Sequence, residues 1–204
     1  MAYSVIQLND MIDELGEGAC KKILSQYSCP YNQDVEEFLT GRKAIDLARQ
    51  GVTRTYLIFA PYKGEQKIAG YFSIAMKWFS LEPKRLSLSS AERKRITRHG
   101  QYDKLLRRYQ ITAPLIAQLG KNFSGGCAEL ITGDELLHLA IEKVGQAQAI
   151  VGGRVVYLEC EPVPSLVDFY ERNGFVQFGE RELERADRAL HKKSHLLQML
   201  KYLG

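Results

Sequence analysis

Residues that bind metals or form disulfides are scarce in this sequence. Its 204 residues include four histidines and four cysteines, and none of the cysteines belongs to a Cys-x-x-Cys pair. Zinc sites need closely spaced Cys and His ligands, and disulfide frameworks are typical of short secreted chains. We therefore expect no bound metal, and we expect reduced thiols in a cytoplasmic protein.

Long apolar runs are missing as well. The longest uncharged apolar stretches, such as Tyr56–Tyr62 and Tyr71–Met76, are far shorter than the ~20 residues of a membrane-spanning helix. The first residues, Met1–Asp13, have neither the basic start nor the apolar core of a secretion signal. The composition, 45% hydrophobic and 25% charged, excludes a disordered, collagen-like or purely coiled-coil chain. We expect a single domain over residues 1–204, without membrane attachment.

Positive charge is concentrated in one segment. The net charge of the chain is +4, but residues 84–108 hold nine basic and two acidic residues, which leaves −3 for the rest. The basic residues are Lys84, Arg85, Arg93, Lys94, Arg95, Arg98, Lys104, Arg107 and Arg108. Ser89 or Ser90 can cap a short helix beginning near Ala91. The segment is either a solvated helical insertion or a surface for the phosphates of RNA or another polyanion.

Hydrophobic periodicity predicts an α/β sheet of mixed direction. Helical spacing over residues 20–47 is broken at Ser28-Cys29-Pro30, which predicts two helices. Strand-like segments 53–60 and 67–76 flank a turn and predict a hairpin. The later elements are expected as strand 112–120, helix 129–150, strand 154–160, helix 165–173 and a strand from Phe175. Segment 194–203 fits a strand or a helix.

A glycine-bearing loop joins strand 112–120 to the following helix. The loop contains Ser124-Gly125-Gly126, and the helix start contains Thr132-Gly133-Asp134. Free N–H groups and the positive end of the helix dipole favour an anion at such a place, and small residues allow close approach. The pattern indicates either a phosphate cradle or a plain turn.

A second pattern is Phe169-Tyr170-Glu171-Arg172-Asn173-Gly174-Phe175. Tyr170 lies on the last turn of a predicted helix, Gly174 can end that helix, and Phe175 opens a strand. As a pattern alone, it also fits a packed core aromatic whose hydroxyl reaches water.

Taken in register, the two patterns resemble the GNAT superfamily of acyl-CoA-dependent N-acetyltransferases over about residues 53–203. The segment around Tyr170 matches the family's Tyr-x-x-x-Gly-Phe element in full. The family's pyrophosphate pattern, Arg/Gln-x-x-Gly-x-Gly/Ala, is matched in part, since Gly133 fills the last glycine position. Ala128 and Ile131 stand at the Arg/Gln and first glycine positions. The resemblance implies a GNAT-like mixed, mostly antiparallel central sheet with helices on both faces.

The resemblance also implies transfer of an acetyl group from acetyl-CoA to an amine, and residues for that reaction. The residues implied to bind the cofactor are Gln118, Leu119, Gly120, Lys121, Gly126, Thr132, Gly133 and Asp134. Backbone N–H groups around Leu119–Lys121 would stabilise the carbonyl oxygen as charge develops. Tyr170 would protonate the departing thiolate, because a phenol is protonated at neutral pH. Glu159 or Glu161, or a water that they order, would act as the base.

A less specific likeness connects the chain to toxin-type acetyltransferases that acylate aminoacyl-tRNA. It rests on Tyr27-Ser28-Cys29, Glu37-Phe38-Leu39 and the strand segment Gly70-Tyr71-Phe72. It implies tRNA as an acceptor, with a small amine or a protein amine as alternatives. Assembly as a homodimer is open. So is a non-catalytic acyl-CoA-binding or protein-interaction module with the same fold, given Ala128 and Ile131.

Overall fold

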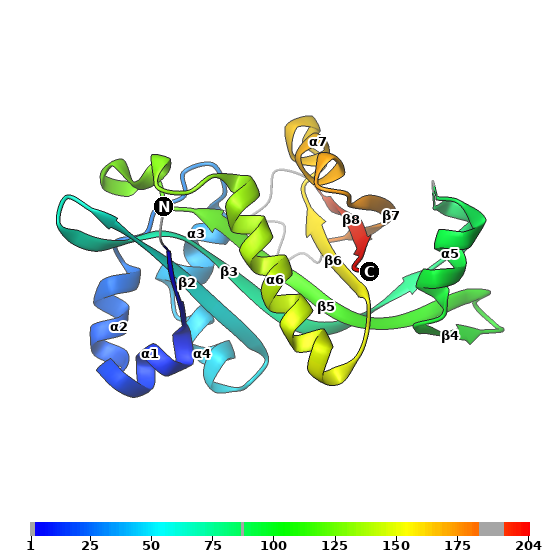
Figure 1. Ribbon diagram of the computed structural model, residues 1–204, viewed down its shortest axis with the longest axis horizontal. Helices are drawn as coiled ribbons and strands as arrows, with labels where there is room; N and C mark the ends of the chain where they lie inside the picture. Colours follow the sequence, from blue (N-terminus) through cyan, green and yellow to red (C-terminus); the bar gives the residue numbers. More distant parts are fainter. Residues whose placement is uncertain (1–2, 87, 184–193) are drawn as a thin grey trace. The chain divides into compact units, whose positions relative to one another are not determined.

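The computed structural model describes residues 3–86, 88–183 and 194–204 (Figure 1). Unit 1 comprises Met1–Ala75 and Ala117–Ala140, and unit 2 comprises Met76–Ile116 and Ile141–Gly204. The elements are β1 (Ser4–Gln7), α1 (Leu8–Leu15), α2 (Glu17–Leu24), α3 (Gln33–Thr40), α4 (Lys43–Arg49), β2 (Thr53–Tyr62), β3 (Glu65–Leu81), η1 (Pro83–Arg85), α5 (Ser90–Thr97), β4 (Gly100–Asp103), β5 (Arg108–Lys121), η2 (Ser124–Glu129), α6 (Gly133–Val151), β6 (Val155–Cys160), α7 (Pro164–Arg172), β7 (Val176–Glu182) and β8 (His195–Tyr202).

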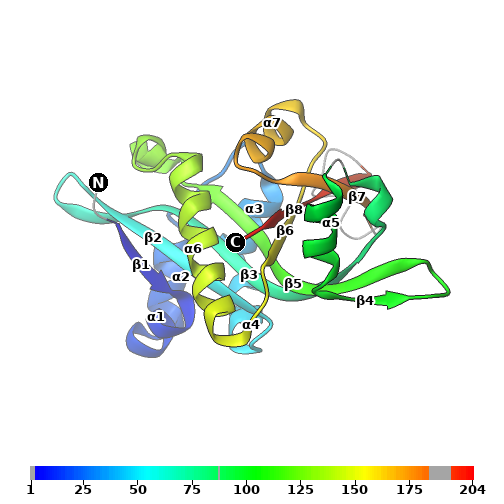
Figure 2. The ribbon, with the colours of Figure 1, turned by 45° about the vertical axis from the view of Figure 1, so that its right-hand side comes forward.

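Within the described residues, the strands form an 8-stranded sheet in the order β1-β2-β3-β5-β6-β8-β7, and β4 pairs with β5 (Figure 2). The pairs β1–β2, β2–β3, β4–β5, β6–β8 and β7–β8 are antiparallel. The β5–β6 pair is parallel, with Leu115 opposite Tyr157 and Ile116 opposite Leu158. The expected mixed, mostly antiparallel sheet is therefore confirmed.

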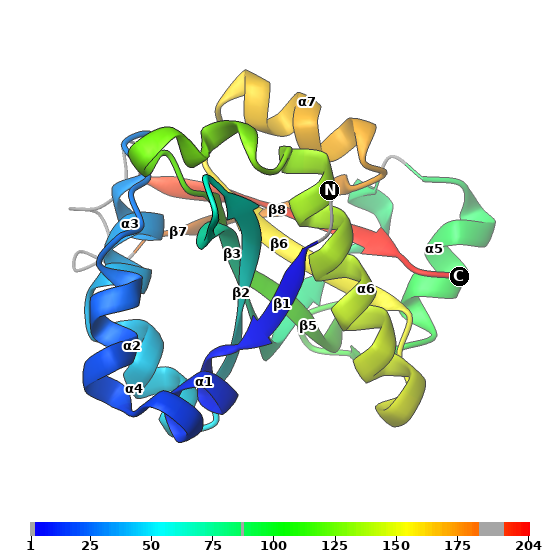
Figure 3. The same ribbon diagram turned by 60° about the vertical axis from the view of Figure 1, so that its left-hand side comes forward.

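In unit 1, helices α1 to α4 cover one face of the strands (Figure 3). Helix α1 buries Leu8, Met11 and Ile12, the i, i+3, i+4 spacing of an apolar stripe. Tyr71 of β3 anchors this core. Its ring lies 6.2 Å from that of Phe38, and its hydroxyl donates a 2.6 Å hydrogen bond to the Val35 carbonyl oxygen. The buried polar tip is thereby paired, as burial requires.

The opposite face of unit 1 is covered by the first turns of α6 (Figure 3). A Cβ added at Gly70 of β3 would lie 3.2 Å from the Leu136 side chain. It would also lie 2.9 Å from the Gly120 carbonyl oxygen, so a larger residue would push the helix or β5 away. Since Tyr71 points to the α3 side, the expected helices on both faces are confirmed in unit 1.

Unit 2 has its own core and carries the basic segment. Phe79 of β3 packs against Tyr157 and Phe178, with ring centroids 4.7 and 4.6 Å apart. The predicted helix near Ala91 is α5, and Ser89 caps it in a reciprocal capping box with Glu92. Beyond α5 the segment forms β4, which pairs with the start of β5, so it is a helix followed by a hairpin.

Some elements were not specified by the sequence patterns. Residues 4–15 form β1 and α1, although the mixed composition of residues 1–18 gave no clear period. The segment 195–202 is a strand, because it pairs with β6 on one side and β7 on the other. Such pairing is decided by tertiary contacts rather than by local propensity. No helix among the described residues is long and apolar enough to cross a membrane.

Candidate active site

The end of β5 is held in unit 1 by the buried side chain of Asn122. Its Nδ2 donates to the Ile68 carbonyl oxygen at 2.8 Å, and its own N–H donates to the Ala69 carbonyl oxygen at 2.8 Å. Its Oδ1 accepts from the N–H groups of Ser28 and Ser124, each at 3.0 Å. One residue therefore joins β5, β3 and the loop after α2.

The loop that follows Asn122 is tied to the same neighbour. The Phe123 N–H donates to the Ser28 carbonyl oxygen at 2.8 Å, and the Ser124 hydroxyl donates to the Gln26 carbonyl oxygen at 2.5 Å. These bonds fix the start of η2. The loop predicted to bind the cofactor is therefore held in place by hydrogen bonds within unit 1.

Gly120 of β5 faces α3 and the preceding loop. A Cβ there would lie 2.4 Å from both the Tyr27 hydroxyl and a Val35 methyl, so only glycine fits. Two residues earlier, Gln118 donates a 2.8 Å hydrogen bond from Nε2 to Asp34 Oδ2. The predicted residues Gln118 and Gly120 thus share one face of β5, as the period of a strand requires.

Lys121 and Gly126 lie on either side of this loop anchor. The Lys121 ammonium lies 5.9 Å from the centre of the Phe123 ring, at the edge of solvent. Gly125 and Gly126 both have positive φ, 57° and 85°. A Cβ on Gly126 would meet the Tyr62 hydroxyl at 2.5 Å. Position 126 therefore requires glycine for two reasons, its positive φ and its close packing on Tyr62.

The start of α6 is closed by a capping box. The Thr132 N–H and hydroxyl donate to Glu135 Oε2 at 2.8 and 2.7 Å, and the Glu135 N–H donates to the Thr132 hydroxyl oxygen at 3.1 Å. The Tyr3 hydroxyl donates to the other carboxylate oxygen at 3.0 Å. The N–H and hydroxyl of Thr132, followed by Tyr3, lower the pKa of Glu135. A negative charge therefore already lies at this helix start, next to Gly133 and Asp134.

In unit 2, Tyr170 projects from α7 with its side chain buried. Its ring lies 5.9 Å from that of Phe175, edge to face. Burial, and then the neighbouring Cys160 thiol, raise the pKa of Tyr170. Its hydroxyl forms no hydrogen bond with the residues that the structure describes. The phenol is protonated at neutral pH.

Glu159 lies on β6, on the face of that strand opposite to its neighbour Cys160. Its carboxylate accepts hydrogen bonds from Arg181 Nε at 2.7 Å and Gln198 Nε2 at 2.9 Å. Cys160, which neighbours Tyr170, follows Glu159 directly, and successive strand residues point to opposite faces. Tyr170 and Glu159 are therefore separated by the sheet.

The structure thus distributes the predicted residues between the units. The eight predicted cofactor-binding residues lie in unit 1, on residues 118–134, and the two predicted catalytic residues lie in unit 2. Sequence analysis missed Asn122 and Glu135. It also missed Arg181 and Gln198, the two hydrogen-bond partners of Glu159. An Asn that bonds the N–H two residues later forms an Asx-turn, so Asn122 followed by Ser124 was a readable signal. The partners of Glu159 had no such signal. No described group of three His, Cys, Asp or Glu side chains is arranged to hold a metal.

No protein-family model matches the chain, and neither does any curated protein. Solved structures do match. AtaT complexed with acetyl-methionyl-tRNA has a TM-score of 0.61 at 18% identity, over 96% of this chain and 94% of AtaT. A tyrosine-to-phenylalanine mutant of KacT has a TM-score of 0.61 at 15% identity, over 97% and 94%.

This chain shares the fold of AtaT and KacT. AtaTR bound with acetyl-CoA also matches, with a TM-score of 0.57 at 18% identity, over 96% of this chain and 92% of that one. AtaT and KacT have the GNAT fold, so the expectation of a GNAT-like fold is confirmed. The likeness extends over nearly the whole chain, including residues before β2, which lie outside the GNAT resemblance over residues 53–203.

Proposed function

We propose that the protein is an N-acetyltransferase that moves an acetyl group from acetyl-CoA to an amine. The observation that carries this proposal is the fold shared with AtaTR bound with acetyl-CoA and with AtaT complexed with acetyl-methionyl-tRNA. A strand, a tied glycine loop and a helix start follow one another in unit 1, the order that suits a CoA pyrophosphate.

Unit 1 would hold the donor. The backbone around Leu119–Lys121 would pair with the pantetheine arm and offer an N–H group to the thioester oxygen. The Lys121 ammonium, at the end of β5, would meet a phosphate. Asn122 would keep this strand end in place through its buried hydrogen bonds.

Tyr170 would act on the leaving sulfur. During the reaction the amine nitrogen forms a bond to the acetyl carbon, and the C–S bond breaks to release a CoA thiolate. The raised pKa of Tyr170 makes the phenol a weaker acid than the thiol. Its hydroxyl therefore donates a hydrogen bond to the thiolate, and solvent completes the protonation.

Glu159 would receive the proton of the attacking amine, directly or through a water. A neutral amine is needed for attack, so a nearby carboxylate that accepts a proton favours the reaction. Arg181 and Gln198 hold the Glu159 carboxylate in one orientation.

Calorimetric titration with acetyl-CoA, with desulfo-CoA as control, tests the donor site. Micromolar binding of both, followed by release of free CoA thiol with an amine acceptor, is the expected result. If neither ligand binds at millimolar concentration, the chain is a non-catalytic module with the GNAT fold, the alternative that Ala128 and Ile131 motivate.

We further propose that the acceptor amine is carried by RNA. Lys94, Arg95 and Arg98 of the basic segment are exposed and have no ion-pair partner among the described residues. AtaT, which shares the fold, is complexed with an acetylated aminoacyl-tRNA. Cytoplasmic location, a homodimer and a single domain with a basic insertion at about 84–108 remain predictions.

Salt dependence tests the RNA proposal. Affinity for methionyl-tRNA should fall steeply between about 50 and about 200 mM salt, because phosphate binding releases counterions. The double variant Arg95→Gln, Arg98→Gln should flatten this slope, whereas Arg42→Gln in unit 1 should leave it unchanged. Affinity that is independent of salt would exclude an RNA acceptor bound through this segment.

A further inference from the structure

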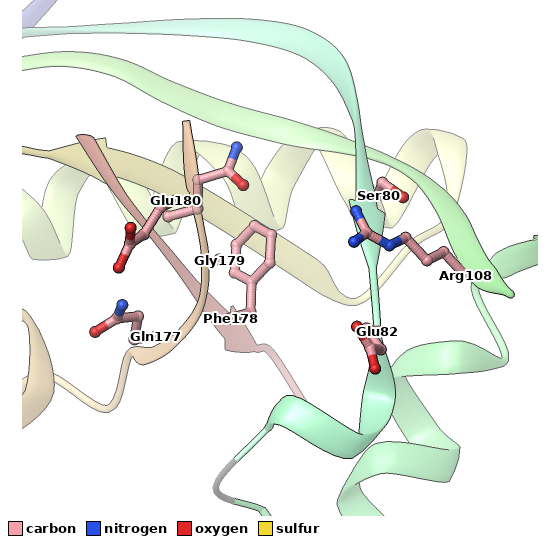
Figure 4. A pocket seen from close by; sticks show the side chains of 8 residues that line it. Ser80, Glu82, Arg108, Gln177, Phe178, Gly179 and Glu180 are labelled. Carbon is pink, nitrogen blue, oxygen red and sulfur yellow. The ribbon is translucent and has the colours of Figure 1, made fainter. Parts of the chain in front are cut away.

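Unit 2 contains a cavity of about 580 Å³. None of the residues proposed to bind acetyl-CoA lines this cavity. The cavity is lined by Ser80, Glu82, Arg108, Gln177, Phe178, Gly179, Glu180 and Gln198 (Figure 4). These residues come from the end of β3, the start of β5, and strands β7 and β8. A volume of this order suits a small organic group.

The wall of the cavity on β7 is formed by a bulge. The β7–β8 register shifts between Gln177 and Gly179, so Phe178 is left out of the pairing. Phe178 packs into the core against Phe79, which makes this wall rigid. A Cβ on Gly179 would lie 2.9 Å from Gln198 Oε1, so glycine lets the Gln198 side chain lie across the strand.

Gln198 connects the cavity to Glu159. Its Nε2 donates the 2.9 Å hydrogen bond to the Glu159 carboxylate, and Gln198 itself lines the cavity. The cavity is therefore one hydrogen bond away from the proposed base. It lies on the Glu159 face of β6, whereas Tyr170 neighbours Cys160 on the other face. An acceptor in the cavity and a leaving thiolate at Tyr170 would be on opposite sides of the sheet.

The lining of this cavity has more negative than positive charge, whereas the neighbouring basic segment is positive. Its lining has two carboxylates, Glu82 and Glu180, against one guanidinium, Arg108. The basic segment leaves the lining just after Glu82 and returns to it at Arg108. A cationic head group is favoured inside and a polyanionic body outside.

We propose that this cavity binds the primary ammonium end of the acceptor, with Glu180 as its carboxylate partner and the polar rim formed by Gln177 and Gln198. The proposal rests on the proposed acetyl transfer for its biological meaning. The cavity itself is tested without acetyl-CoA, so the two fail separately.

Titration with methylammonium chloride, followed by NMR of the Gln177 and Gln198 side-chain amides, tests the cavity directly. Both signals should shift saturably over the millimolar range, and sodium acetate should not shift them. Glu180→Gln should weaken the apparent affinity roughly fivefold, the upper end of what one exposed charged partner contributes. Glu142→Gln, which removes the same charge from an exposed site on α6 in the same unit, should leave the affinity unchanged.

The absence of a saturable shift, an equal response to acetate, or an unchanged affinity in Glu180→Gln would overturn the proposal. A kinetic arm with methionyl-tRNA adds a functional readout: Glu180→Gln should raise KM for methionyl-tRNA about fivefold and leave KM for acetyl-CoA unchanged. If the unaltered protein binds acetyl-CoA and does not acetylate methionyl-tRNA, the RNA acceptor is wrong and the titration alone decides the cavity.

Discussion

Tyr170 and Glu159 lie on opposite faces of strand β6. Tyr170 reaches the strand at Cys160, and Glu159 turns toward Gln198 and Arg181. Acyl transfer needs the reacting atoms within about 3.5 Å of each other. Tyr170 on α7 and Glu159 on β6 would therefore act on the thioester from two sides only beyond Ile116 and Leu158, where the pairing of β5 with β6 ends.

Tyr170→Phe should lower kcat roughly a hundredfold, because the developing thiolate loses the hydrogen bond that stabilises its charge. The affinity for acetyl-CoA should stay within about twofold of the original, since the ring remains in place. Thermal unfolding should change little, because the hydroxyl has no partner among the described residues. Measuring kcat by thiol release and Kd by calorimetry separates the two effects.

Tyr202→Phe is the matched control for this experiment. Tyr202 belongs to β8 in the same unit, and its change should leave both constants as they are. Full activity in Tyr170→Phe would show that the leaving thiolate needs no hydrogen bond from Tyr170, and Tyr170 would then be a core aromatic.

Asn122→Ala should lower the free energy of unfolding by about 3 kcal/mol, because several buried partners lose their hydrogen bonds at once. Affinity for acetyl-CoA should fall with it, since the end of β5 is no longer held. Asn9→Ala, which removes a single 3.1 Å hydrogen bond to the Ala48 carbonyl oxygen, should lower the free energy of unfolding by only about 1 kcal/mol. Urea denaturation checks both, and an equal loss in the two variants would contradict the anchoring role.

Local patterns predicted the parts of this fold that depend on local rules. The Ser89 cap and the β2–β3 hairpin follow from short sequence signals, and the structure contains both. The strand at 195–202 and the Arg181–Glu159 ion pair depend on residues distant in the chain, which no local period encodes. Ala128 and Ile131 show the same limit, because the fold is kept although the family's pyrophosphate pattern is incomplete.

Glu135→Gln should tighten acetyl-CoA binding about two- to threefold at low salt, because it removes a negative charge from the helix start where the phosphates are proposed to bind. Glutamine preserves the capping box with Thr132, so stability should change little. Calorimetry at two salt concentrations measures the effect, and Glu14→Gln on α1 serves as a control of equal charge. Weaker binding in Glu135→Gln would place the phosphates elsewhere.

Alkaline pH should destabilise the protein from about pH 9 upward. Burial raises the pKa of Cys160 from 9.0 to about 11, and burial also raises the pKa values of Tyr170 and Tyr71 above 10.0. Below pH 9 these groups are protonated in the folded and unfolded chains alike, so their contribution to stability is complete. At higher pH the unfolded chain releases protons that the folded chain keeps, which favours unfolding by up to about 1.4 kcal/mol per pH unit for each group.

Urea denaturation between pH 7.5 and 10.5 measures this slope, and Cys160 provides a specific check on its cause. Cys160→Ala removes one of the thiols that begin to ionise near pH 9 in the unfolded chain, so its free energy of unfolding should fall less steeply between about pH 9 and about pH 10 than that of the original protein. The variant loses some packing at every pH, but packing does not change the slope. A slope that is the same in both proteins would mean that the Cys160 thiol ionises as readily in the folded chain as in the unfolded one.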